Sequence, residues 1–165
     1  ILVINPNASK SMTQKIGQVA GLVCREDTDV TVKCLERGPV TIESSYDEAY
    51  AIGPTIDLVR EAVQENYDAI ILACFCEVGV EAAREISSVP VFGLEEVTLA
   101  TAITLGNKFG ILTEKLPRVA MKERHVRRYG PLRHSGHRMV RKGTCSGSHV
   151  TAGAGRERTD RCPPR

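Results

Sequence analysis

Short runs of aliphatic residues alternate with helix-length stretches along the first two thirds of the chain. The runs lie at residues 1–4, 30–35, 69–73, 89–93 and 109–112. Runs that are apolar on both faces are typical of strands buried in a parallel sheet, and their alternation with helices is typical of βαβ units. The sequence therefore predicts an α/β fold, a parallel sheet flanked by helices, with a ligand site at the carboxyl ends of the strands.

The intervening stretches carry helix signals. Residues 16–23 place four apolar side chains at the spacing i, i+3, i+4, i+7, which predicts an amphipathic helix. Ser45-x-x-Glu48 is a capping-box pattern and predicts the start of a second helix. Because proline lacks an amide proton, we expect Gly53-Pro54 to kink or divide that helix. Residues 114–129 are compatible with one more helix.

Charge and composition divide the chain near its last quarter. Residues 1–113 carry 8 basic and 16 acidic residues, whereas residues 114–165 carry 14 basic and 4 acidic residues. Residues 130–165 show neither the 2-residue period of a strand nor the 3.6-residue period of a helix. A stretch of this kind cannot bury enough apolar surface to offset the entropy lost on ordering. We therefore expect an α/β domain over 1–113, a linking helix over 114–129, and an irregular or disordered basic tail over 130–165.

Composition also excludes several classes of protein. The longest apolar run covers residues 69–76, far short of the about 20 residues of a membrane-spanning helix, and we expect no secretory leader. Aromatic residues make up only 4%, which argues against base stacking on nucleic acid. Six cysteines in no dense pattern favour a reducing compartment. We expect a cytoplasmic protein with no membrane partner and no specific nucleic-acid partner.

The loop of residues 74–79 follows the most apolar strand and precedes a helix. A thiol there, Cys74, lies near a helix N-terminus, whose partial positive charge favours the thiolate, while the Glu77 carboxylate opposes it. The alternative is that Cys74 is a small buried residue that ends the strand. A redox pair with Cys76 is less favoured, because no CxxC motif is present.

Polar side chains follow the first and last strands. Asn5, Asn7, Ser9 and Ser11 come between the first strand and a helix, where they suit either an anionic or amide-bearing ligand or ordinary helix capping. Thr113 ends the fifth strand in a similar position. Both interpretations stay open from the residues alone.

The tail contains nitrogen and sulfur groups that are chemically able to bind zinc. They are His134, His137, Cys145, His149 and Cys162. Their spacing fits no tight pair-and-pair pattern, so we predict no metal site.

Several motifs, taken in chain order, resemble the aspartate/glutamate/hydantoin racemase superfamily, and most closely its hydantoin/allantoin racemase branch. The resemblance covers about residues 1–130. The motifs are Ile4-Asn5-Pro6-Asn7-Ala8-Ser9 with Met12-Thr13, Gly38-Pro39 with Ile42-Glu43-Ser44, Tyr67–Phe75, Pro90–Glu96 and Leu105–Thr113.

The resemblance implies a cofactor-independent isomerase built of two similar α/β halves, with one catalytic cysteine from each half. One thiolate removes the proton from the stereocentre of a hydantoin or related amino-acid derivative, and the other thiol returns a proton on the opposite face. Cys74 matches the first catalytic cysteine. Asn7 and Thr113 match positions that line the substrate pocket, and Ser44 and Cys76 are further substrate-binding candidates. We expect a small-molecule substrate and a homo-oligomer.

The sequence departs from the family pattern at two places. Residues 76–78 are Cys-Glu-Val, where the family usually has Gly-Asp-Pro. Cys145 follows no apolar strand, and a frameshifted or foreign ending would explain that absence together with the composition of the tail. The second half is then truncated or replaced, and we expect an impaired racemase. The alternatives are a single-cysteine decarboxylase or isomerase of the same superfamily, and a non-catalytic racemase-like binding protein.

Overall fold

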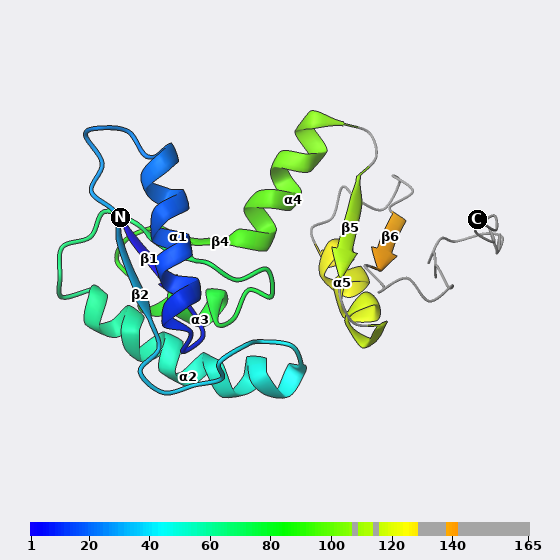
Figure 1. Ribbon diagram of the computed structural model, residues 1–165, viewed down its shortest axis with the longest axis horizontal. Helices are drawn as coiled ribbons and strands as arrows, with labels where there is room; N and C mark the ends of the chain where they lie inside the picture. The colour runs from blue at the N-terminus through cyan, green and yellow to red at the C-terminus, as the bar shows by residue number, and fades with distance from the viewer. Residues whose placement is uncertain (107–108, 114–115, 129–137, 142–165) are drawn as a thin grey trace, which may run out of the picture. The chain divides into compact units, whose positions relative to one another are not determined.

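The computed structural model describes residues 1–106, 109–113, 116–128 and 138–141, which fall into two compact units (Figure 1). The first unit covers residues 1–98 and the second residues 99–165, and each is described by itself. The elements of the first unit are β1 (Leu2–Asn5), α1 (Lys10–Val23), β2 (Thr31–Cys34), α2 (Ser45–Ala62), β3 (Ile70–Leu72), α3 (Val80–Ile86) and β4 (Val91–Gly93). Helix α4 (Leu94–Leu105) runs from the first unit into the second, which also holds β5 (Gly110–Thr113), α5 (Leu116–Arg128) and β6 (Arg138–Arg141).

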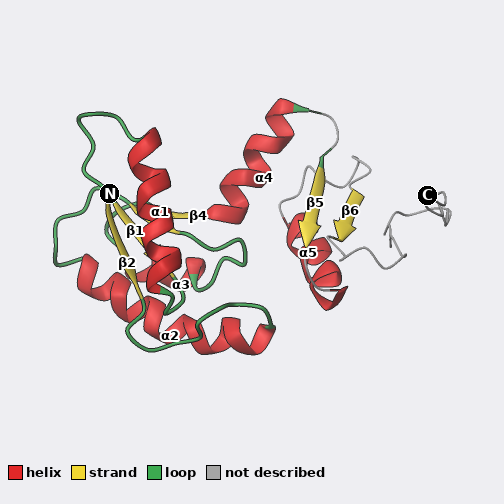
Figure 2. Ribbon diagram, in the orientation of Figure 1, coloured by secondary structure: helices red, strands yellow, loops and turns green. Residues whose placement is uncertain are grey.

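The first unit is built on a four-stranded sheet in the order β2-β1-β3-β4, and every pair of neighbouring strands is parallel. Leu2 lies opposite Thr31 on one side and Ile70 on the other, and Ile70 lies opposite Val91. Helix α1 packs against β1 and β2, whereas α2 and α3 pack against each other and against β1 and β4 respectively (Figure 2). The predicted parallel sheet flanked by helices is therefore confirmed.

The core forms where β1 and β3 meet α2 and α3. Leu2 and Ile4 of β1 and Ile70 and Leu72 of β3 are wholly buried. The other buried members of this cluster are Val59, Ala62, Val80, Ala83 and Val91. Since burying one aliphatic side chain contributes roughly 1.5–3 kcal/mol, these two central strands supply much of the unit's stability.

Two helices differ in detail from the sequence prediction. No residue of α1 is fully buried, and Val19 and Val23 of its predicted apolar face are 60% and 78% exposed. Helix α2 begins one residue earlier than predicted, because Ser44 is the N-cap and its capping box is formed with Asp47. The helix then runs through Pro54 to Ala62 without being divided.

The second unit contains a pair of parallel strands. Gly110 of β5 lies opposite Arg138 of β6, and Thr113 lies opposite Arg141. We expected irregular chain over residues 130–165, whereas residues 138–141 form strand β6, which pairs with β5. The rest of that expected tail lies outside the described residues. Within the described ranges, no helix is both long and apolar enough to cross a membrane.

Candidate active site

At one edge of the first unit's sheet, backbone hydrogen bonds connect the loop after β3 to the end of β1 and the loop after β2 to the loop after β1. The Ala73 N–H donates to the Ile4 carbonyl at 2.8 Å, which fixes the start of the loop after β3 beside the end of β1. The Leu35 N–H donates to the Asn7 carbonyl at 3.1 Å. The parallel sheet thus brings residues that are about 70 positions apart in sequence to the same edge, as expected for strand carboxyl ends.

Side-chain hydrogen bonds fix the loop after β1. Asn5 is 1% exposed, and its Nδ2 donates to Asn7 Oδ1 at 2.8 Å and to Thr13 Oγ1 at 3.0 Å. The Ser9 N–H donates to the same Asn7 Oδ1 at 2.9 Å. Ser9 is also the N-cap of α1, and its Oγ accepts from the Met12 N–H at 3.2 Å. Ser9 therefore caps α1 and also fixes the Asn7 side chain, within one network of hydrogen bonds.

The loop after β3 carries two half-buried thiols. The Cys74 carbonyl accepts from the Glu77 N–H at 3.2 Å, and both Glu77 (φ 52°) and Gly79 (φ 74°) adopt left-handed backbone conformations that turn the chain toward α3. Cys74 and Cys76 pack against a small apolar cluster of Leu35, Ala51 and Val78. Helix α3 begins only at Val80, so Cys74 is not part of its first turn, where the helix dipole acts most strongly.

A polar cluster ties this loop to the first turn of α4. Glu77 Oε1 accepts from the Glu96 N–H at 2.6 Å, and Glu96 Oε1 accepts from the Gly93 N–H at 3.1 Å. The Arg84 guanidinium forms an ion pair with the Glu96 carboxylate and also donates to the Val91 carbonyl at 2.9 Å and 3.1 Å. The loop that bears the thiols is thus bonded through Glu77 to the first turn of α4, and Arg84 of α3 forms an ion pair with the same turn.

The predicted site residues lie in three different parts of the structure. Asn7, Cys74 and Cys76 belong to the loops at the carboxyl edge of the first unit's sheet. Ser44 is exposed, and its hydroxyl bonds Asp47 as the N-cap of α2, which accounts for a serine there. Thr113 ends β5 in the second unit and is half-buried.

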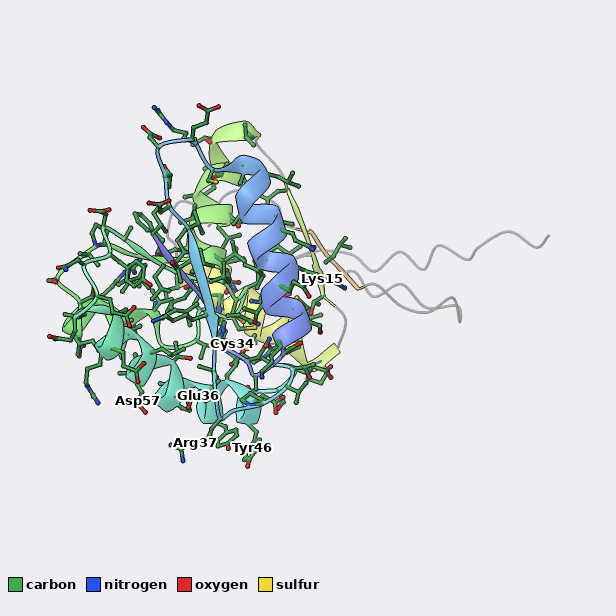
Figure 3. All side chains as sticks on the ribbon, turned by 60° about the vertical axis from the view of Figure 1, so that its left-hand side comes forward. Lys15, Cys34, Glu36, Arg37, Tyr46 and Asp57 are labelled. Atoms are coloured by element: carbon green, nitrogen blue, oxygen red, sulfur yellow. The ribbon has the colours of Figure 1, made fainter. Side chains whose placement is uncertain are left out.

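Figure 3 shows Cys34, the last residue of β2, and the outward-pointing side chains of Arg37, in the loop after β2, and Tyr46, in α2. Among the described residues, no group of three or more His, Cys, Asp or Glu side chains has the geometry of a metal site. The tail residues His134, His137, Cys145, His149 and Cys162 lie outside the described part of the chain. Strand β6, however, ends shortly before Cys145, at a place where we expected no strand.

Two acidic residues at the site were not selected from the sequence. Glu95, in the first turn of α4, is wholly buried, and Glu77 bridges to α4 through its carboxylate. The available signal for Glu95 was the Glu95-Glu96 pair directly after a strand, at the edge of the sheet where ligands bind. No comparable signal identified the bridging role of Glu77, because it depends on where α4 begins.

Comparison with known proteins gives one consistent family. The Asp/Glu/Hydantoin racemase family model matches residues 1–162, which extends past residue 130, where we expected the resemblance to end. The hydantoin racemase of Pseudomonas sp. (strain NS671) is 37% identical over 131 residues, which are 79% of this chain and 52% of that protein. The hydantoin racemase of Paenarthrobacter aurescens is 38% identical over 120 residues, 72% of this chain and 50% of that protein.

Solved structures agree with the sequence relatives. Allantoin racemase from Klebsiella pneumoniae superimposes with a TM-score of 0.79 at 30% identity, covering 85% of this chain and 56% of that one. Allantoin racemase from Pseudomonas fluorescens gives 0.75 at 27% identity, covering 84% and 59%. The chain spans about half the length of the curated relatives that it matches.

Proposed function

The chain belongs to the Asp/Glu/hydantoin racemase family, a family of isomerases, and on this basis we propose that it moves the α-proton of a hydantoin or a related amino-acid derivative. The observation that carries the proposal is the Ala73–Ile4 hydrogen bond of 2.8 Å, which holds the start of the Cys74 loop beside the end of β1, three residues before Asn7. A thiol and an amide side chain thereby share the place where an α/β sheet binds its ligand. The matched relatives carry the name hydantoin racemase, which supports this substrate class.

In the proposed reaction the Cys74 thiolate is the base. The bond between the α-carbon and its proton breaks, the S–H bond forms, and the electron pair passes into the neighbouring carbonyl to give an enolate oxygen. Hydrogen-bond donors directed at that oxygen lower the barrier, because they meet the charge as it develops. Asn7 supplies such a donor in our proposal, and no cofactor is needed for the step.

Inversion requires a second acid on the opposite face of the α-carbon. Among the cysteines of the described residues, Cys74 and Cys76 lie on one loop, Cys24 caps α1 and is exposed, and Cys34 ends β2. In our proposal the two thiols of this loop approach the planar enolate from the same side. We therefore expect this chain to racemise hydantoins poorly, and we propose that it exchanges the α-proton with solvent faster than it inverts the stereocentre.

The proposal is tested with one enantiomer of 5-methylhydantoin in deuterated buffer. Proton NMR follows loss of the α-proton, and circular dichroism follows inversion, with the non-enzymatic rate subtracted. Exchange that falls to background in Cys74→Ser and persists in the exposed control Cys24→Ser supports the proposal. Equal rates of exchange and inversion, both abolished by Cys145→Ser, would show instead that Cys145 completes a competent racemase.

The one-loop placement of the thiols also favours the single-cysteine alternative, a decarboxylase or isomerase of the same superfamily. A decarboxylase would release carbon dioxide from a substituted malonate, with Cys74 protonating the resulting enolate on one face. A binding protein would retain 5-methylhydantoin without exchange or decarboxylation. We also propose a homo-oligomer in the cytoplasm, which sedimentation and cell fractionation test directly.

A further inference from the structure

We infer that Asn5 and Thr13 are positioning residues that hold the Asn7 side-chain amide in a single orientation, so that its NH₂ group and not its carbonyl oxygen meets the ligand. The inference rests on the proposed function for the existence of that ligand. It adds a requirement on the substrate, which must bring an oxygen acceptor to Asn7. The orientation of the Asn7 amide follows from the single proton of the Thr13 hydroxyl, through the hydrogen bonds that connect Thr13 to Asn5 and Asn5 to Asn7.

The network starts at Thr13 on α1. Its hydroxyl donates to the Ser9 carbonyl at 2.8 Å, the bond that a helical threonine makes with the residue four positions earlier. A hydroxyl carries one proton, so once that proton is used its oxygen can only accept. The Asn5 atom that lies 3.0 Å from Thr13 Oγ1 must therefore be the donor Nδ2.

The next link is between the two asparagines. With the Asn5 Nδ2 directed at Asn7 from 2.8 Å, the Asn7 atom in contact must be the acceptor Oδ1. The Ser9 N–H, at 2.9 Å from the same atom, requires the same assignment independently, because a backbone N–H only donates. Turning the Asn7 amide around would place an NH₂ group against two donors at once.

The consequence concerns the other end of the Asn7 amide. Because an amide is planar and its oxygen is engaged by two donors, its Nδ2 is directed away from the Asn5–Ser9 side. Within the described part of the chain, Asn7 Nδ2 has no hydrogen-bond partner, and Asn7 is half-buried at the sheet edge. A ligand carbonyl or carboxylate oxygen beside the acidic carbon fits this donor, and a ligand N–H does not.

The inference is tested with two variants and one matched control. Asn5→Asp replaces the side-chain donor by an acceptor. Thr13→Val removes the hydroxyl from a half-exposed position without changing the shape of the side chain. This second variant keeps the test informative if the variant at the buried Asn5 folds poorly. Thr98→Val is the control, since Thr98 makes the same intrahelical bond, to the Leu94 carbonyl at 2.6 Å, on a different helix. Each protein is examined without ligand and with 5-methylhydantoin or its 4-thio analogue, in which sulfur replaces the oxygen next to the α-carbon.

Two measurements report on the orientation. In Asn5→Asp the acceptor of the Ser9 N–H, Asn7 Oδ1, should turn away, so hydrogen exchange of that N–H in the ligand-free chain should accelerate about tenfold. The acceleration should be smaller in Thr13→Val and absent in Thr98→Val. By calorimetry, the wild-type chain should bind the oxygen compound about fivefold more tightly than the thio compound, the equivalent of one net hydrogen bond. That preference should fall toward unity in Asn5→Asp, partly in Thr13→Val, and remain in Thr98→Val.

The outcomes separate the inference from the proposed function. Unchanged Ser9 exchange in both network variants, or an oxygen preference that survives in both, would overturn the inference. Accelerated Ser9 exchange with no binding of 5-methylhydantoin by any of the proteins would support the network and overturn the substrate class instead.

Discussion

The Glu77 carboxylate accepts a hydrogen bond of 2.6 Å from the backbone N–H of Glu96, which joins the loop of the two thiols to the first turn of α4. The contact pairs an anion with the N-terminal end of a helix, where the backbone N–H groups lack intrahelical partners and the helix dipole favours negative charge. Glu77 reaches this position from a left-handed backbone conformation (φ 52°), which is uncommon for a residue other than glycine. The bond therefore fixes the shape of the loop as well as the helix end.

Removing this carboxylate should destabilise the first unit. In Glu77→Ala the Glu96 N–H loses its acceptor, and we expect the free energy of unfolding to fall by about 1–2 kcal/mol, as for a lost helix cap. Urea denaturation measures the change. Glu85→Ala, an exposed acidic residue on α3, is the control and should change little. Equal unfolding midpoints for wild type and Glu77→Ala would refute the bridging role.

Gly93 should tolerate no side chain. A Cβ at this position would lie 2.6 Å from Glu77 Oε1 and 3.0 Å from Val80 Cγ2, and that carboxylate is already anchored by α4. We expect Gly93→Ala to lower the free energy of unfolding by about 1–3 kcal/mol through overpacking. Gly21→Ala in α1, where nothing lies within 4 Å, should instead raise it by about 0.5–1 kcal/mol. A stabilised Gly93→Ala variant would contradict this packing.

The two thiols of the loop should differ in their kinetic roles. If Cys74 carries the proton, Cys74→Ser lowers kcat for α-proton exchange by about 10²–10⁴-fold. If Cys76 only contacts the substrate, Cys76→Gly changes KM with kcat nearly constant. Steady-state exchange kinetics with 5-methylhydantoin distinguish the two. The reverse assignment, with kcat lost in Cys76→Gly and kept in Cys74→Ser, would require the roles to be exchanged.

A surface ion pair should make its largest contribution to stability around neutral pH. The hydrogen bond between Lys33 Nζ and the Glu65 carboxylate, at 2.8 Å, raises the pKa of Lys33 and lowers the pKa of Glu65. A lowered carboxyl pKa contributes stability above its unfolded value of about 4.3, lost as pH falls through the folded value. A raised lysine pKa contributes stability below about 10.4, lost as pH rises through the folded value.

Glu65→Gln tests this dependence. The difference in urea midpoint between wild type and Glu65→Gln should be largest between about pH 5 and pH 10 and should shrink in acid and in alkali. Since both side chains are partly exposed, the difference should also decrease at high salt. A difference that is constant from pH 3 to about pH 11 would show that the substitution acts by something other than this charge pair.

The sheet could be predicted from the sequence because its signal is local. Ile1–Ile4 and Ala69–Ala73 are apolar on both faces, and a strand that must be covered on both faces reads as an unbroken aliphatic run. The predicted start of α2 differs from the observed one by one residue, because Ser44 and Ser45 both suit an N-cap. Only the structure shows that Asp47 completes the capping box with Ser44. The positions of Asn7, Cys74 and Cys76 at one sheet edge follow from the same parallel topology.

The remainder of the site depends on contacts between distant residues. The Asn5 side chain is fixed by Thr13, which is eight positions away and reaches it only because α1 begins where it does. Periodicity assigned Val19 and Val23 to a buried face, yet burial requires a partner surface, and the described chain provides none over those two residues. The sequence did not predict strand β6, because Met139 and Val140 are too few to give a period and their partners in β5 lie 28 positions earlier.

The position of β1 sets the order in which the first unit can fold. This strand comes first in the sequence but lies in the interior of the sheet, with β2 on one side and β3 on the other. Its second neighbour, β3 (Ile70–Leu72), is separated from it in sequence by α1, β2 and α2. Pairing β1 with β3 therefore closes a long loop and costs a large loop-closure entropy. During synthesis on a ribosome, Leu2 and Ile4 therefore remain without their β3 partners until residue 72 has emerged. A substitution that weakens β3, such as Ile70→Ala, should consequently slow folding of the whole unit and lengthen the time for which nascent chains are bound by chaperones.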